Sequence, residues 1–250
     1  MPVTEVNGLA LHTQVLGAGP PAAMLHGLLV GSLASWYFGA APRLARTHRV
    51  LLFDLRGHGR SAAAQTGYDV DTLSRDLEAL LDEFDPRPAL VVGHSYGALA
   101  ALRFALRRPD RVARLALVEA PLPPSSLSEL REFLSRGPSD MAAALPAELR
   151  TALDKGGRRA AGLLRQLGGL SQSTLLHDLA AEGDIPDDEL ARIACPTLLL
   201  YGDRSSLRPV GERLARVIPD ARLEILPGGH FLPSEAPGPL AEALEKFAHG

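Results

Sequence analysis

The sequence predicts an α/β fold: a mostly parallel, doubly wound sheet with an N-terminal antiparallel hairpin and an inserted helical cap. Three observations lead to this prediction. Short apolar segments recur along the 250 residues, helical patterns lie between most of them, and one long stretch holds helical patterns without any strand-like segment. Alternating strands and helices are typical of a parallel sheet that is covered by helices on both faces.

The first two strands are predicted to form a hairpin. Residues 3–6 and 9–15 flank Asn7-Gly8, and this dipeptide is the strongest two-residue turn signal because both residues tolerate a positive φ. An antiparallel pair therefore precedes the parallel strands.

Six further strands are predicted where apolar residues mostly run without alternation, as they do in strands buried on both faces. They cover residues 22–25, 50–53, 90–92, 115–118, 197–201 and 223–226. Four helices are predicted over residues 69–84, 98–108, 210–217 and 239–247. The first of these helices places Leu73, Leu77 and Leu81 on one face, which indicates that it packs against the sheet.

Residues 121–192 interrupt the alternation. Ser126-Leu127-Ser128-Glu129 has the pattern of a capping box that opens a helix. Further helical patterns lie near residues 147–153, 158–167 and 173–181, and the leucine content is too high for a disordered linker. We therefore expect residues 1–120 and 193–250 to form the core and residues 121–192 to form a helical cap over an active site.

The composition excludes several classes of protein. The net charge is −3, whereas a nucleic-acid-binding surface needs clustered excess Lys and Arg. The sequence has no uninterrupted apolar run of ~18 residues, which is the length that a membrane-spanning helix needs, so no membrane span is predicted. The single cysteine, Cys195, excludes a disulfide framework, and no motif predicts a metal site or a cofactor. The first residues lack the cationic and apolar regions of a secretory signal, so we expect a cytoplasmic protein.

Gly93-His94-Ser95-Tyr96-Gly97 lies directly between a predicted strand and a predicted helix. In this G-x-S-x-G context a sharp turn lifts a serine above the sheet, so Ser95 is the predicted nucleophile. The backbone N–H of Tyr96, at the start of the helix, is predicted to stabilise an oxyanion. A serine needs a base, and His230 is the predicted base because it follows the last strand in a glycine-rich loop.

With these motifs in this order, the sequence resembles the α/β-hydrolase fold superfamily over almost its whole length. The motifs are His26-Gly27, the segment from Asp54 to Ser61 (DLRGHGRS), the serine motif and Pro227-Gly228-Gly229-His230. The resemblance implies that the backbone N–H of Leu28 is a second oxyanion donor. It also implies that His26 and the segment 54–61 support the site structurally.

The acid that should orient His230 has two candidates. The family pattern places it after the strand at residues 197–201, where the chain reads GDRSSLRP from Gly202 to Pro209. One alignment puts Ser205 at the acid position, and another puts Asp203 there.

Glu119, at the end of the strand at residues 115–118, is the other candidate. A carboxylate buried at that point needs a partner, and His230 would provide one. Some haloalkane dehalogenases and related hydrolases are similar in taking the acid from this strand end. We prefer Glu119 and keep Asp203 as the alternative. In either case the acid would fix the tautomer of the histidine and stabilise the imidazolium.

The resemblance implies an acyl hydrolase that acts on an ester, a thioester or a related small hydrophobic acyl substrate through an acyl-enzyme on Ser95. A serine in place of aspartate argues against dehalogenase and epoxide hydrolase chemistry. The alternatives are a biosynthetic cyclase or acyltransferase, a C–C bond hydrolase, and a non-catalytic ligand-binding receptor. Basic residues outnumber acidic ones by seven to five over residues 125–169, so an acyl carrier or a CoA-linked substrate is a candidate partner.

Overall fold

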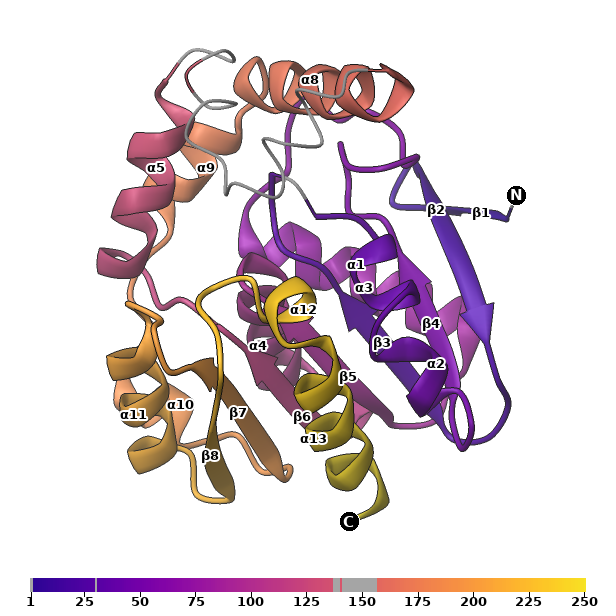
Figure 1. Ribbon diagram of the computed structural model, residues 1–250, viewed down its shortest axis with the longest axis vertical. Helices are drawn as coiled ribbons and strands as arrows, with labels where there is room; N and C mark the ends of the chain where they lie inside the picture. The colour runs from indigo at the N-terminus through magenta and orange to yellow at the C-terminus, as the bar shows by residue number, and fades with distance from the viewer. Residues whose placement is uncertain (1, 30, 137–139, 141–156) are drawn as a thin grey trace.

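The computed structural model describes residues 2–29, 31–136, 140 and 157–250, and an eight-stranded sheet runs through its centre (Figure 1). The strand order is β1-β2-β4-β3-β5-β6-β7-β8. The strands are β1 (Val3–Val6), β2 (Leu9–Leu16), β3 (Pro21–Leu25), β4 (Arg49–Phe53), β5 (Ala89–His94), β6 (Val112–Val118), β7 (Thr197–Gly202) and β8 (Ala221–Leu226). Strand β2 is antiparallel to β1 and β4, and the other pairs are parallel. The predicted fold class is confirmed.

The hairpin between β1 and β2 turns at Asn7 and Gly8. Val6 pairs with Leu9 across the turn, and both turn residues have a positive φ, of 50° and 73°. Two positive φ values match the right-handed twist of the flanking strands. The dipeptide therefore sets the register of the first strand pair.

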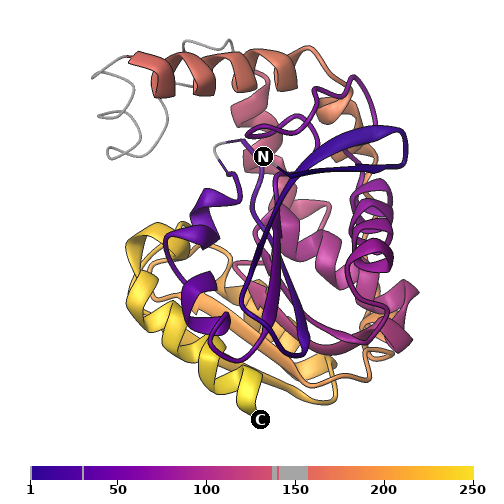
Figure 2. The ribbon, with the colours of Figure 1, turned by 90° about the vertical axis from the view of Figure 1, so that its right-hand side faces the viewer.

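Helices cover both faces of the sheet, as the side view shows (Figure 2). One face carries α3 (Val70–Phe84), α4 (Tyr96–Arg107) and α11 (Arg208–Val217). The other carries α1 (Ala34–Tyr37), α2 (Ala41–Leu44), α12 (Leu232–Glu235) and α13 (Pro237–His249). Strand residues alternate between the two apolar cores: Val91 packs on the first and Val92 on the second. The sheet is therefore doubly wound.

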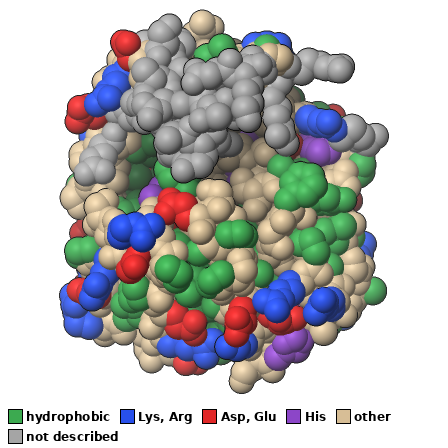
Figure 3. All heavy atoms as spheres, in the orientation of Figure 1, with side chains coloured by type: hydrophobic (Ala, Val, Ile, Leu, Met, Phe, Trp, Pro, Cys, Tyr) green, Lys and Arg blue, Asp and Glu red, His purple; other side chains and the backbone are tan. Residues whose placement is uncertain are grey.

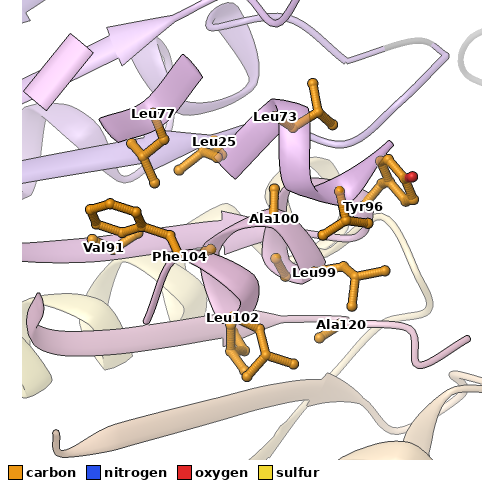
Figure 4. Close-up of a cluster of buried hydrophobic side chains, with 14 of the residues drawn as sticks. Leu25, Leu73, Leu77, Val91, Tyr96, Leu99, Ala100, Leu102, Phe104 and Ala120 are labelled. Atoms are coloured by element: carbon orange, nitrogen blue, oxygen red, sulfur yellow. The ribbon is translucent and has the colours of Figure 1, made fainter. Parts of the chain in front are cut away.

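The packing of α3 and α4 places the serine motif. Helix α3 begins after Asp69, whose carboxylate accepts a hydrogen bond from the Thr72 N–H at 2.8 Å. Its apolar face meets α4, where Leu73 and Leu77 lie near Ala100 and Phe104 (Figure 4). Helix α4 is therefore held firmly over the sheet with its N-terminus at the end of β5.

Between β6 and β7 the described residues form helices and no strand. These are η2 (Ser125–Leu127), α5 (Ser128–Leu134), α8 (Gly157–Ser171), α9 (Leu175–Ala181) and α10 (Asp187–Leu190). Helix α8 crosses one end of the molecule, with α5 and α9 beside it (Figure 1). The helix expected over residues 147–153 lies outside the described residues.

Charges of both signs share the surface. On the face seen in Figure 3, acidic and basic side chains alternate along the lower part, where α13 lies. There Lys246 pairs with Glu242 at 2.7 Å and Arg43 pairs with Glu245 at 3.1 Å. Within the described part of the chain, no helix has the length and apolarity that crossing a lipid bilayer requires.

Candidate active site

Neighbouring parallel strands end side by side at the site. Leu25 of β3 pairs with Gly93 of β5, and His94 of β5 pairs with Val118 of β6. The residues that follow these strand ends therefore meet at one edge, next to the point where the chain order in the sheet reverses. Ligands in open α/β sheets bind at such an edge.

Ser95 occupies a sharp turn between β5 and α4, with φ 55° and ψ −125°. A Cβ atom on Gly93 would lie 2.4 Å from the Ala98 Cα, and one on Gly97 would lie 2.4 Å from the His26 carbonyl oxygen. Only glycine fits at either position. A non-glycine residue with this backbone is strained, and such strain persists only where the surrounding structure holds it. The Ser95 side chain does not cap the helix, so its hydroxyl is available for another partner.

Three side chains form a continuous line of contacts. Ser95 Oγ lies 2.9 Å from His230 Nε2, and His230 Nδ1 lies 3.2 Å from Glu119 Oε2. The Glu119 side chain is fully buried, whereas 35% of the His230 side chain is exposed. A nucleophile, a base and a buried acid at these distances have the geometry of a catalytic triad.

Glu119 is held by groups other than His230. Its own backbone has a positive φ of 54°, and its N–H donates to the Leu200 carbonyl. Its Oε1 accepts a hydrogen bond from the Gly202 N–H at 2.6 Å, and its Oε2 accepts one from the Ser205 hydroxyl at 2.5 Å. Two donors besides the histidine therefore hold the carboxylate in a fixed orientation.

Asp203 lies elsewhere. Its Oδ1 accepts a hydrogen bond from the Gly228 N–H at 2.9 Å, and half of its side chain is exposed beside Arg204. It braces the loop that carries His230 and does not contact the imidazole. Of the two candidate acids, the structure brings only Glu119 to His230. Ser205, the other residue that the family alignment offered, donates its hydroxyl hydrogen to Glu119.

His94 is a residue of the site that the motif analysis passed over. Its Nε2–H donates to the His230 carbonyl at 2.8 Å, and the two rings lie 5.3 Å apart. Burial, together with the neighbouring His230, lowers the pKa of His94 to about 3, so this imidazole stays neutral. Its hydrogen bond fixes the backbone of the loop that carries His230. The sequence did offer a signal for this residue, because His94 directly precedes the serine of the G-x-S-x-G motif.

The loop after β3 lies directly against the serine. A Cβ atom on Gly27 would lie 3.1 Å from the Ser95 Cβ. The backbone N–H groups of Leu28 and Tyr96 donate to no other group among the residues that the structure describes. An oxyanion needs backbone N–H donors of this kind, so the described part of the chain keeps Leu28 and Tyr96 as candidates for that role.

Two buried histidines hold this loop. His26 Nδ1–H donates to the Gly27 carbonyl at 2.7 Å, and its Nε2 accepts from the Leu55 N–H at 2.9 Å. His58 Nε2 accepts from the Leu29 N–H at 3.1 Å. Burial lowers the pKa of His26, and it lowers the pKa of His58 to about 3 with help from the adjacent His26. A ring nitrogen that accepts a hydrogen bond carries no proton, so both imidazoles are neutral.

In the parts of the chain that the structure describes, no three His, Cys, Asp or Glu side chains are grouped as metal ligands. A cavity of about 460 Å³ is lined by Leu33 of the segment after β3 and by His12, Asp54 and Tyr37, among others. Neither Ser95 nor His230 lines it, so it is separate from the line of three side chains.

Proteins that are similar to this chain in sequence or in structure include an esterase and a hydrolase. Residues 23–155 match the family described as the alpha/beta hydrolase fold. The chain is 33% identical over 240 residues to a pimeloyl-[acyl-carrier protein] methyl ester esterase of Chromobacterium violaceum, covering 89% of this chain and 91% of that protein. It is similar in structure to a hydrolase from Pseudomonas aeruginosa PA01, with a TM-score of 0.82 and 27% identity over 100% of this chain and 98% of that one.

A third relative is longer. The chain is 32% identical over 249 residues to the dihydrolipoyllysine-residue acetyltransferase component of an acetoin-cleaving system of Pseudomonas putida. The match covers 93% of this chain but 65% of that protein. The chain thus spans slightly less than two thirds of this relative.

Proposed function

The chain belongs to the α/β-hydrolase fold family, and from this premise we propose that it is a serine hydrolase that cleaves an acyl substrate through an acyl-enzyme on Ser95. The observation that carries the proposal is the contact line from Ser95 through His230 to Glu119, with distances of 2.9 and 3.2 Å. Relatives named as hydrolases and esterases support the reaction class.

In the proposed first step, Ser95 Oγ attacks the acyl carbon while His230 Nε2 takes the hydroxyl proton. The Nδ1–H of His230 then donates to Glu119, which fixes the reactive tautomer and stabilises the imidazolium. The carbonyl oxygen becomes an oxyanion, and the N–H groups of Leu28 and Tyr96 would donate to it. The imidazolium protonates the leaving group, and the acyl-enzyme remains.

In the second step a water molecule attacks the acyl-enzyme. His230 takes a proton from this water and returns it to Ser95 Oγ as the acid product leaves. The acid and the enzyme in its starting state are the result. Every proton transfer in this cycle uses the same nitrogen, which lies at hydrogen-bonding distance from the serine.

The proposed substrate is a small hydrophobic ester or thioester. The chain's esterase relative is named for an acyl group carried on an acyl carrier protein, so a carrier-linked or CoA-linked acyl group is a natural candidate. We place the helices of residues 121–192 as the cap of this substrate site. Transfer of the acyl group to an acceptor other than water is the second candidate, because one relative is named as an acetyltransferase component.

A fluorophosphonate probe tests the nucleophile. Such a probe should label the native chain and the Ser206→Ala variant, because Ser206 is exposed and outside the contact line. It should not label Ser95→Ala, and that variant should lose activity on activated esters by several orders of magnitude. Labelling that survives Ser95→Ala would contradict the proposal.

Product masses then separate hydrolysis from transfer. Acyl thioesters and esters of rising chain length are incubated with the enzyme in the presence of an amine or alcohol acceptor. A free acid as the Ser95-dependent product supports hydrolysis. An acyl group recovered on the acceptor, or a ring that is one water lighter than the free acid, supports the acyltransferase or cyclase alternative.

A further inference from the structure

Three successive peptide groups beside Ser95 are each held by a different side chain. The peptide between Gly27 and Leu28 is held through its carbonyl by His26 at 2.7 Å. The next peptide is held through the Leu29 N–H by His58 at 3.1 Å. The Leu29 carbonyl, which belongs to the third, accepts a hydrogen bond from Gln166 Nε2 at 2.5 Å. The first of these peptides carries the Leu28 N–H.

Gln166 differs from the two histidines in its place in the chain. His26 and His58 follow strands β3 and β4, whereas Gln166 lies on helix α8, between β6 and β7. The third hold on the loop therefore depends on where helix α8 sits.

The amide of Gln166 is bound on both sides, so its orientation is fixed. Its Oε1 accepts a hydrogen bond from the Gly59 N–H at 2.9 Å, while its Nε2 donates to the Leu29 carbonyl. A backbone N–H can only donate and a carbonyl can only accept, so a flipped amide would lose both bonds. One side chain thus joins helix α8 to the loops after β3 and β4.

The loop that Gln166 contacts needs such a hold. Leu29 has φ 69°, a left-handed conformation that is unfavourable for a residue other than Gly, Asn or Asp. A Cβ atom on Gly31 would lie 2.0 Å from the Gly27 carbonyl oxygen, so the chain turns back tightly on itself. A strained turn keeps its shape only while its contacts persist.

We propose that Gln166 is a positioning residue that couples the seating of helix α8 to the geometry of the Leu28 N–H. The coupling rests on the proposed function, because the Leu28 N–H is an oxyanion donor only if Ser95 is the nucleophile. With α8 seated, all three peptide groups are held and the Leu28 N–H faces the reaction. With α8 displaced, the Leu29 carbonyl loses its donor and the loop relaxes.

The test compares near-isosteric changes at Gln166. Gln166→Met removes both hydrogen bonds, whereas Gln166→Glu keeps an acceptor for Gly59 but places a carboxylate against the Leu29 carbonyl. Loss of one oxyanion donor lowers kcat by roughly 10²–10³-fold, so we expect an indirect loss of about 10-fold for Met and a larger loss for Glu. KM should change less than about twofold, because the lost interaction acts in the transition state.

Gln172→Glu is the matched control. Gln172 is exposed just after α8, so this variant makes the same chemical change away from the loop and should retain native kcat. If Gln166→Glu has native kcat, or if its loss lies in KM alone, the proposal is overturned.

Hydrogen exchange provides a readout that does not depend on turnover. Amides of the peptide over residues 24–33 should exchange faster in Gln166→Glu than in the native chain or in Gln172→Glu, with the thermal midpoint nearly unchanged. Unchanged exchange overturns the coupling even if Ser95 is the nucleophile. If exchange is faster in Gln166→Glu but the fluorophosphonate probe does not label Ser95 in the native chain, the proposed function is overturned. The contact between Gln166 and the loop is then still supported.

Discussion

Glu119 is fully buried, and its carboxylate accepts hydrogen bonds from three groups, two at the end of β7 and one in the loop after β8. They are the Gly202 N–H, the Ser205 hydroxyl and the His230 imidazole. A buried carboxylate with this many donors remains oriented without any exposed ion pair. Its position at the end of β6 brings it under the histidine loop.

Replacing Glu119 should therefore impair chemistry far more than replacing Asp203. Glu119→Gln should lower kcat by about 10³–10⁴-fold, because the amide no longer stabilises the imidazolium or the required tautomer. Asp203→Asn keeps an oxygen for the Gly228 N–H and should retain kcat within about threefold. Steady-state rates on an activated ester measure both. A large loss in Asp203→Asn with a native Glu119→Gln would reverse the assignment.

At the scale of elements, the turn between β5 and α4 depends on glycines that have no room for a side chain. Gly97→Ala would place a Cβ atom 2.4 Å from the His26 carbonyl oxygen. We expect it to lower the free energy of unfolding by about 1–3 kcal/mol and to abolish labelling of Ser95. Urea unfolding and the probe measure the two effects.

Gly168 on helix α8 is the opposite case. A Cβ atom there would meet nothing within 4 Å, and alanine is favoured over glycine inside a helix. Gly168→Ala should raise the free energy of unfolding by about 0.5–1 kcal/mol with native labelling. If Gly97→Ala instead kept native labelling and gained stability as Gly168→Ala does, the steric explanation of the turn would be wrong.

The elements with a local signal were predictable from the sequence. Asn7-Gly8 predicted the hairpin, and Asp69 with its apolar periodicity predicted α3 within one residue. The four-residue helices α1, α2, α10 and α12 were not predicted individually, because one turn is too short to show a period. Strand β6 begins at Val112, three residues before its predicted start, since Arg114 interrupts the apolar run.

The candidate site was predictable to a different degree at each residue. Ser95 and His230 stand in motifs with strong local constraints. The acid stayed ambiguous because Glu119 and Asp203 both follow strands, and only strand order and loop shape decide which one reaches the histidine. Gln166 had no signal at all, since it acts through a helix whose position is set by tertiary packing.

At the scale of the whole molecule, buried histidines link stability to pH. His58 has a pKa lowered by burial to about 3, against 6.5 for an ordinary histidine. As pH falls below about 6.5, His58 binds a proton in the unfolded chain but stays neutral in the folded chain. Stability is therefore present above this pH and is lost progressively toward pH 3. His94 acts in the same direction.

His58→Gln tests this link, because glutamine can still accept the Leu29 N–H without titrating. The free energy of unfolding, measured in urea between pH 7 and pH 4, should depend less steeply on pH in this variant. The slope should fall by up to about 1.4 kcal/mol per pH unit. The exposed His177, replaced by Gln, is the control and should leave the slope unchanged. Equal slopes in the two variants would contradict the role of burial.

Ser95 and Glu119 both have a positive φ, and at both positions selection for stability and selection for activity favour different residues. Each residue sits at a strand end in a conformation that glycine adopts without strain. A lineage selected only to fold would gain from glycine at either position. Retention of side chains at both positions would therefore be a mark of selection for chemistry, and their drift toward glycine in related chains would indicate descendants that kept the scaffold after losing the reaction.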